Sequence, residues 1–171
     1  MVKFICDKYI AGKMMNNKSN SIDILWRNYL NSIGEDENTT KLIYDSWSFG
    51  DNEELANELV ELVLDGEKTA TTSLHYLYQV ENESLPKDGK LGIVTDFEGN
   101  AKCIIETKNV NVLPFSKVDA GFVYKEGEGD KSLEYWREEH IKFFNRVLEG
   151  LDMKFSEDML VVCEEFEVLY K

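Results

Sequence analysis

Apolar residues recur at helical spacing over residues 52–65, which form the clearest helical pattern in the chain. Gly66 follows at the position where a left-handed residue commonly ends a helix. Asp51 and Glu54 stand three residues apart at the start of the pattern, the spacing of a capping box. We therefore expect a helix over residues 52–65 with Asp51 as its N-cap.

A second helical stripe covers residues 22–33 and ends at Gly34. The preceding residues 16–21 are rich in Asn and Ser, which favour turns and caps. The pattern predicts a loop over residues 16–21 and a helix after it.

The second half of the chain contains several patterns that are typical of strands. We expect strands over residues 90–97 and 101–107, joined by a hairpin loop at residues 98–100. Residues 110–113 favour a third strand, and the β-branched and aromatic run at residues 159–170 favours a fourth.

Residues 119–131 hold three glycines and show no apolar period, so we expect a loop there. A helix begins near Asp130 or Ser132, continues with an apolar stripe and ends at Gly150. Helices mixed with short strands in this order indicate an α+β fold.

The composition fits one soluble domain. The chain has 171 residues, of which 43% are apolar, and no apolar run approaches the roughly 18 residues of a membrane span. The N-terminus lacks the pattern of a secretory signal. Cys6, Cys103 and Cys163 are odd in number and widely spaced, which favours reduced thiols in a cytoplasmic protein without membrane partners.

The formal net charge of −14 opposes binding to a long nucleic acid, because such binding depends on neutralising phosphates. It leaves binding of a small uncharged nucleoside unaffected. A local basic patch would require convergence of the lysines in or near the predicted hairpins, which are Lys87, Lys90, Lys102 and Lys108.

The segment after the clearest helix, residues 66–73, places one amine and four hydroxyls within six residues and suggests a functional loop. Gly66, Lys68 and Thr71 form a G-x-K-x-x-T pattern there, which resembles the ASCH domain family of PUA-like proteins. Segments 45–51, 125–137 and 161–168 are also similar to larger bacterial ASCH proteins, so that the resemblance covers residues 45–170.

The resemblance implies an α+β fold with a small PUA-like β-barrel and flanking helices. On this basis, residues 41–171 form the ASCH domain, and residues 1–40 form an N-terminal helical extension packed on it. The oligomeric state is left open.

The resemblance also implies candidate catalytic residues, because some ASCH enzymes remove the acetyl group from the exocyclic amine of acetylcytidine. In that interpretation Thr71 is the nucleophile and Lys68 activates it, since a hydroxyl is a weak nucleophile without such a neighbour. The required glutamate is Glu128 or Glu126, with Glu128 preferred. Ser73 stands where those enzymes have an arginine and cannot supply a guanidinium.

Other residues near the motif are candidates for ligand binding. We expect Trp47 to be partly exposed and to offer an aromatic face for a base, with Phe49 buried. Thr69, Ser73 and Tyr76 are further candidate ligand-binding residues.

Three functions follow from these features. The first is a hydrolase of a modified or acylated pyrimidine nucleoside that uses neither metal nor other cofactor, since His75 and His140 lie 65 residues apart and no metal-ligand set is visible. The second is a non-catalytic module that binds a nucleotide or single-stranded RNA, and the third is a ribonuclease. His140 falls on the inner stripe of its helix and is expected to be structural.

Overall fold

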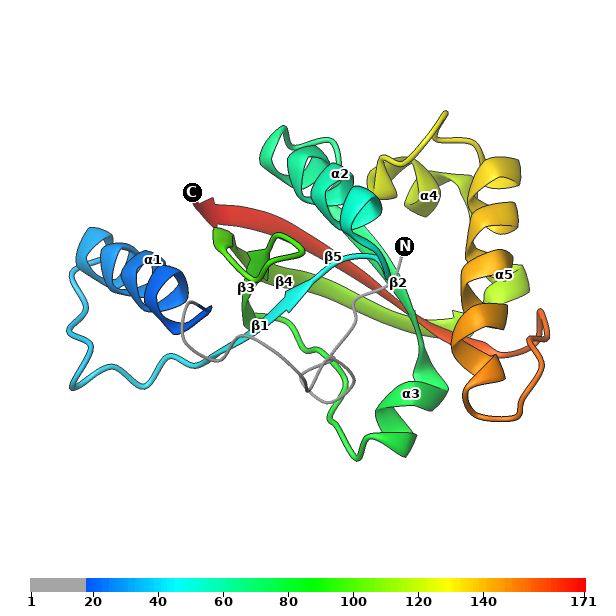
Figure 1. The fold of residues 1–171 in the computed structure, drawn as a ribbon, viewed down its shortest axis with the longest axis horizontal. Helices are drawn as coiled ribbons and strands as arrows, with labels where there is room; N and C mark the ends of the chain where they lie inside the picture. The colour runs from blue at the N-terminus through cyan, green and yellow to red at the C-terminus, as the bar shows by residue number, and fades with distance from the viewer. Residues whose placement is uncertain (1–17) are drawn as a thin grey trace.

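The structure, a computed structural model, describes residues 18–171. A curled five-stranded sheet with strand order β1-β3-β4-β5-β2 forms its centre, and helices flank the sheet (Figure 1). The strands are β1 (Tyr44–Ser48), β2 (Ala70–Leu74), β3 (Leu91–Thr95), β4 (Ala101–Pro114) and β5 (Leu160–Tyr170). The helices are α1 (Lys18–Ser32), α2 (Glu53–Leu64), α3 (His75–Val80), α4 (Ala120–Glu126) and α5 (Leu133–Glu149), with a 3₁₀ turn η1 (Phe115–Lys117). The expected α+β class is confirmed.

The sheet is a half-barrel whose two edges are β1 and β2. Strands β1 and β3 are parallel, whereas the pairs β3–β4, β4–β5 and β5–β2 are antiparallel. The two strands expected at residues 101–107 and 110–113 form one strand, β4, whose register with β5 shifts between Thr107 and Asn109. Such a bulge lets a long strand bend, which suits a curled sheet.

Helix α2 occupies the predicted range, but its cap differs by one residue from the prediction. Asn52 has extended backbone angles, and its side-chain oxygen accepts from the Leu55 N–H at 3.0 Å. The prediction of Asp51 as N-cap is wrong, because Asp51 instead pairs with Arg146 of α5 at 2.8 Å. Gly66 follows the helix with a φ of 76°, as expected for a terminating glycine.

Helix α1 begins earlier than its apolar stripe suggested. The predicted loop over residues 16–21 is wrong for 18–21, which are helical, while residues 16 and 17 lie outside the described part. Trp26, Tyr29 and Leu30 of α1 are buried with Leu91, Ile93 and Ile104 of the sheet. The division into residues 1–40 and 41–171 stays a prediction.

Two segments that were expected as loops are regular structure. Residues 120–126 form α4, because Asp119 caps it by accepting from the Phe122 N–H at 3.0 Å. Residues 70–73 belong to β2, whose five residues are all buried and pair with β5. Sequence patterns did not predict these two elements, because buried polar residues such as Thr72 and Glu126 have their hydrogen-bond partners far away in the sequence.

Helix α5 begins after Ser132, as predicted, and packs its apolar stripe into the main core. Ser132 caps it by accepting from the Tyr135 N–H at 3.1 Å. The fully buried members of this core include Phe49, Leu59, Val63, Leu74, Val94, Ile105, Phe115, Phe143, Phe144, Leu148 and Val161. Helices α2 and α5 thereby share one core with the sheet. The segment that carries Lys68 follows α2 directly.

Within residues 18–171, no helix is long and apolar enough to cross a membrane. Cys103 and Cys163 are buried free thiols, and burial raises the pKa of each to about 12. Cys6 lies outside the described residues.

Candidate functional site

Lys68 lies between the end of α2 and the start of β2, and backbone hydrogen bonds fix it at both ends. Its N–H donates to the Leu62 carbonyl at 3.0 Å, and the next N–H, from Thr69, donates to the Lys125 carbonyl at 2.8 Å. The motif is therefore attached to both α2 and α4. This attachment brings the Lys68 side chain to the C-terminal end of α4.

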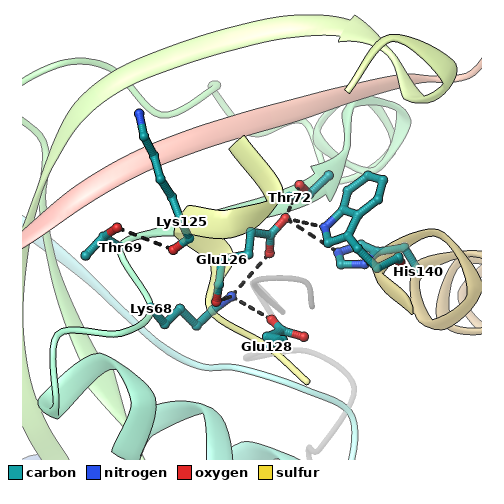
Figure 2. A network of polar contacts seen from close by, with 8 residues as sticks. Lys68, Thr69, Thr72, Lys125, Glu126, Glu128 and His140 are labelled. Atoms are coloured by element: carbon teal, nitrogen blue, oxygen red, sulfur yellow. Dashed lines mark hydrogen bonds and ion pairs between the residues drawn. The ribbon is translucent and has the colours of Figure 1, made fainter. Parts of the chain in front are cut away.

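The Lys68 side chain is fully buried between two glutamates (Figure 2). Its Nζ donates to Glu128 Oε1 at 2.6 Å and to Glu126 Oε2 at 3.2 Å. A longer contact of 3.5 Å reaches the Glu126 carbonyl oxygen. Lys68 thus contacts both glutamates that the sequence offered as alternatives.

Glu126 is also held from the side opposite Lys68. Its Oε1 accepts from Thr72 Oγ1 at 2.6 Å and from Trp136 Nε1 at 2.7 Å. His140 Nε2 lies 3.8 Å from the same oxygen. Figure 2 shows Glu126 between Lys68 on one side and Thr72 and His140 on the other.

The electrostatics of the site favour the ionised forms. Burial lowers the pKa of Lys68, but Glu128 and Glu126 outweigh burial, and the net pKa is raised. Burial raises the pKa of Glu128, whereas Lys68 lowers it, and the net pKa is lowered. A cationic Lys68 cannot act as a base, but it can hold an acceptor atom or stabilise negative charge.

Two glycines with positive φ hold Glu128 in place. Gly127 ends α4 with a φ of 73°, and a Cβ there would lie 2.3 Å from the Glu67 carbonyl oxygen. Gly129 packs so closely against the Tyr135 ring that a Cβ on Gly129 would lie 2.2 Å from it. The backbone therefore passes too close to its neighbours for side chains at 127 and 129, and it fixes the carboxylate between them.

Tyr135 lies at the outer side of this loop and is 39% exposed. Its ring contacts Gly129. Burial is the largest cause of its raised pKa, and Glu139 and then Glu128 add to the rise. Glu128 itself is 9% exposed, whereas Lys68 and Glu126 are fully buried. Glu128 and Tyr135 therefore form the outer part of the site.

Thr71 and Ser73 lie on the opposite face of β2 from Thr72, because successive residues of a strand point to opposite faces. Thr71 pairs with Glu164 across the sheet, and Ser73 Oγ is hydrogen-bonded to Tyr78 Oη at 2.9 Å. Thr72, and not Thr71, is the β2 hydroxyl that contacts Glu126.

The remaining candidates are placed differently. The expected exposure of Trp47 is wrong, since it is 6% exposed and a Cβ on Gly92 would lie 2.0 Å from its ring. Phe49 is fully buried, as expected, with Lys68 Nζ 5.4 Å from its ring centroid. Thr69 Oγ1 donates to the Lys125 carbonyl at 3.3 Å, and Tyr76 is exposed on α3.

Sequence reasoning did not select Thr72, Trp136 or Tyr135 for the site, and it assigned His140 a purely structural place. The spacing of Trp136 and His140 by four residues on a capped helix puts them on one face, which was a usable signal. The contact of both with Glu126 required the helical conformation of α4, which sequence reasoning missed. The described residues contain no group of three or more His, Cys, Asp or Glu placed to hold a metal.

Comparison with known proteins identifies the family. The model of the ASCH domain matches residues 45–170, and the chain belongs to this family. No curated protein gave a significant match. A crystal structure of an ASCH domain from Lactobacillus crispatus JV V101 is similar at 37% identity and a TM-score of 0.83, covering 92% of this chain and 99% of that one. A crystal structure of a protein from Enterococcus faecalis V583 is similar at 38% identity and a TM-score of 0.79, covering 88% of each chain.

These similarities confirm the expected ASCH fold, a PUA-like half-barrel with flanking helices. The family is often proposed to bind RNA.

Proposed function

We propose that this ASCH domain binds a pyrimidine nucleoside, or a nucleotide-like ligand, through Lys68 and Glu128. The observation that carries the proposal is the Lys68 ammonium held 2.6 Å from a Glu128 carboxylate at the edge of the buried cluster. A cytosine edge carries an exocyclic amine that donates and a neighbouring ring nitrogen that accepts. Glu128 would accept from the amine, and Lys68 would donate to the ring nitrogen.

Tyr135 supports this proposal, because its partly exposed ring packs against Gly129, the residue that follows Glu128. Stacking of a base on an aromatic side chain contributes about 1–3 kcal/mol. Trp47, the stacking residue expected from the sequence, is buried and does not offer such a face. We therefore assign the stacking role to Tyr135.

Hydrolysis of an acylated amine, as in acetylcytidine, is the second candidate. It is favoured by a buried cationic Lys68, which in water-poor surroundings could stabilise the oxyanion of an acyl-transfer reaction. Thr71 remains the proposed nucleophile, but it lies on the face of β2 opposite to Thr72, which contacts Glu126. Its proton would also have to go to a group other than the ammonium of Lys68, and both points weigh against hydrolysis. Because the lowered pKa of Glu128 suits an acceptor better than a proton donor, we rank binding first.

The surface charge favours a small ligand over a polymer. Lys90 pairs with Asp45, Lys102 pairs with Asp96, and Lys108 pairs with Glu106 and Glu167. These lysines are neutralised by carboxylates, so they offer little attraction for the phosphates of RNA. A module for single-stranded RNA and a ribonuclease are therefore the weaker alternatives.

The test is a calorimetric titration of the protein with cytidine. The wild-type protein should bind, and Glu128→Gln should bind about 10–100-fold more weakly, because a hydrogen bond to a charged group contributes about 1.5–3 kcal/mol. Glu67→Gln is the matched control, since Glu67 is exposed and pairs only with Lys131 among the ion pairs described. Unchanged affinity in Glu128→Gln would contradict the proposal.

Incubation with acetylcytidine tests the second candidate, with the release of acetate measured by chromatography. Turnover that Thr71→Ala abolishes would establish hydrolysis. Turnover that persists in Thr71→Ala would exclude Thr71 as the nucleophile.

A further inference from the structure

His140 is fully buried on α5, and one of its ring nitrogens has a defined role. Nδ1 lies 2.9 Å from the carbonyl oxygen of Trp136. A carbonyl oxygen can only accept, so Nδ1 carries the proton of that hydrogen bond. In the neutral ring, Nε2 therefore presents a lone pair.

Nε2 is directed at the Glu126 carboxylate but is too far away to bond with it. The separation from Glu126 Oε1 is 3.8 Å, beyond hydrogen-bond distance. Within residues 18–171, Nε2 is buried and has no hydrogen-bond partner. A lone pair opposite a carboxylate oxygen gives no attraction, whereas a protonated Nε2 would form a charge-assisted hydrogen bond.

Within residues 18–171, three charged groups act on His140, and they come from different segments. Glu126 ends α4, Glu128 lies in the loop after it, and Lys68 precedes β2. Burial lowers the pKa of His140 to about 4, the two glutamates act to raise it, and Lys68 acts to lower it. His140 is thus neutral near pH 7 while Lys68 stays in its present position.

The donors of Lys68 are already in use. An ammonium has three N–H donors, and Lys68 Nζ makes three contacts, two with Glu126 and one with Glu128. A ligand that accepts from Lys68 must replace one of them. The contacts with Glu126, at 3.2 and 3.5 Å, are longer than the 2.6 Å contact with Glu128 and would be the first to yield.

We propose that ligand binding at Lys68 is coupled to proton uptake at Nε2 of His140, so that the imidazolium replaces Lys68 as the cation beside Glu126. The inference rests on the proposed function and adds proton linkage to it. A hydronium ion or a buffer acid gives up the proton, so an N–H bond forms at Nε2 while the bond that held the proton in that acid breaks. No covalent bond of the ligand or of the protein breaks. His140 is a positioning residue here, since it acts on the ligand only through Glu126.

Linkage is reciprocal, so the affinity for the ligand must depend on pH. The ligand draws Lys68 away from Glu126, and the pKa of His140 then rises. Proton uptake on binding means that affinity for cytidine falls as the pH rises above about 4, the pKa of His140 before binding, toward the raised pKa in the complex. A merely structural histidine would leave the affinity independent of pH in this range.

The first measurement is a calorimetric titration with cytidine near pH 6 in two buffers of different ionisation enthalpy. The wild-type protein should take up a measurable fraction of a proton, and His140→Asn, which keeps a donor toward the Trp136 carbonyl, should take up none. His75→Asn is the matched control and should behave as wild type. Binding of cytidine without proton uptake by the wild-type protein overturns this inference but leaves the proposed function intact, whereas absence of binding overturns both.

The second measurement uses only the wild-type protein, so it does not depend on whether a variant folds. Nitrogen-15 NMR of labelled histidine distinguishes the two neutral tautomers from the cation, and the chain holds only two histidines. Ligand-free protein near pH 7 should show one histidine protonated at Nδ1 alone, and cytidine should shift its Nε2 signal toward the imidazolium value. An Nε2–H tautomer in the free protein, or an Nε2 signal unmoved by bound cytidine, overturns the inference.

Discussion

Lys68 is the central residue of the candidate site, because it is a fully buried cation whose charge is balanced by two carboxylates. Burying charges is costly, and their mutual attraction repays that cost only while all the partners are present. A buried ion cluster of this kind is weak evidence for stability and better evidence for function, since an apolar core would be as stable.

Replacing Lys68 by Met should destabilise the protein, because Glu126 and Glu128 would remain buried without their shared cation. We expect the free energy of unfolding to fall by about 3–5 kcal/mol, measured by urea denaturation. Adding Glu126→Gln to Lys68→Met should restore part of the loss, since the two sites interact directly. Lys125→Met is the control and should cost less than about 1 kcal/mol, because Lys125 forms a partly exposed surface pair. An equally small cost for Lys68→Met would contradict the buried ion cluster.

His140 should make the stability of the protein depend on pH in mild acid. The pKa of His140 is about 4 in the folded protein, whereas an ordinary histidine, as in the unfolded chain, has a pKa of 6.5. The unfolded chain therefore binds the proton more tightly. The free energy of unfolding therefore decreases as the pH falls from about 6.5 to 4, by up to roughly 3 kcal/mol. Urea denaturation of the wild-type protein and of His140→Gln at several pH values measures this dependence. The difference between their free energies of unfolding should become smaller toward low pH. A constant difference would show that His140 does not titrate in this way.

At the scale of elements, the site is formed where the end of α2, the start of β2 and the end of α4 meet. Backbone hydrogen bonds hold these segments together, including the 2.8 Å bond from the Thr69 N–H to the Lys125 carbonyl. The glycine-flanked turn after α4 then sets the position of Glu128.

Gly127→Ala tests the importance of that turn. Both Gly127 and Gly66 have positive φ, at 73° and 76°, but only at Gly127 would a Cβ collide with a backbone atom, 2.3 Å away. Gly66→Ala should cost about 1–2 kcal/mol from the left-handed conformation alone. Gly127→Ala should cost clearly more and should also weaken cytidine binding. Equal costs for the two variants would show that the turn can shift freely.

Helices α2 and α5 could be predicted because their apolar residues are periodic and their ends carry caps. Polar residues explain the failures, since Thr72 and Glu126 satisfy each other inside the protein and gave no apolar signal for β2 or α4. The position of Asn52 as cap was missed because Asp51 is an equally good capping residue by type. The burial of Trp47 could not be predicted, because its ring packs over Gly92 of β3. Gly92 pairs with Asp45, two residues before Trp47, so only the β1–β3 pairing brings the two together.

At the scale of the whole molecule, the net charge of −14 opposes the binding of RNA, which carries many phosphates, but not the binding of an uncharged nucleoside. The sheet and its helices form the ASCH fold, but a fold does not determine a function, so the fold alone does not choose between these ligands.

Salt dependence should distinguish a small ligand from RNA. Cytidine carries no phosphate, so its affinity should change less than about twofold between roughly 0.05 and 0.5 M salt, measured by calorimetry. Binding of a short single-stranded RNA, if it occurs through backbone phosphates, should weaken by orders of magnitude over a similar range. RNA binding that is tight and independent of salt, together with no binding of cytidine, would contradict the ranking given above.

The most direct measurement is a crystal structure of the protein with cytidine. We predict that the base stacks on Tyr135, with its exocyclic amine within hydrogen-bond distance of Glu128 and its ring nitrogen within hydrogen-bond distance of Lys68 Nζ. In the same crystal, Glu126 Oε1 should lie closer to His140 Nε2 than the present 3.8 Å. A base bound elsewhere, with the contacts of Lys68 to Glu126 and Glu128 unchanged, would contradict recognition of the nucleoside by Lys68 and Glu128.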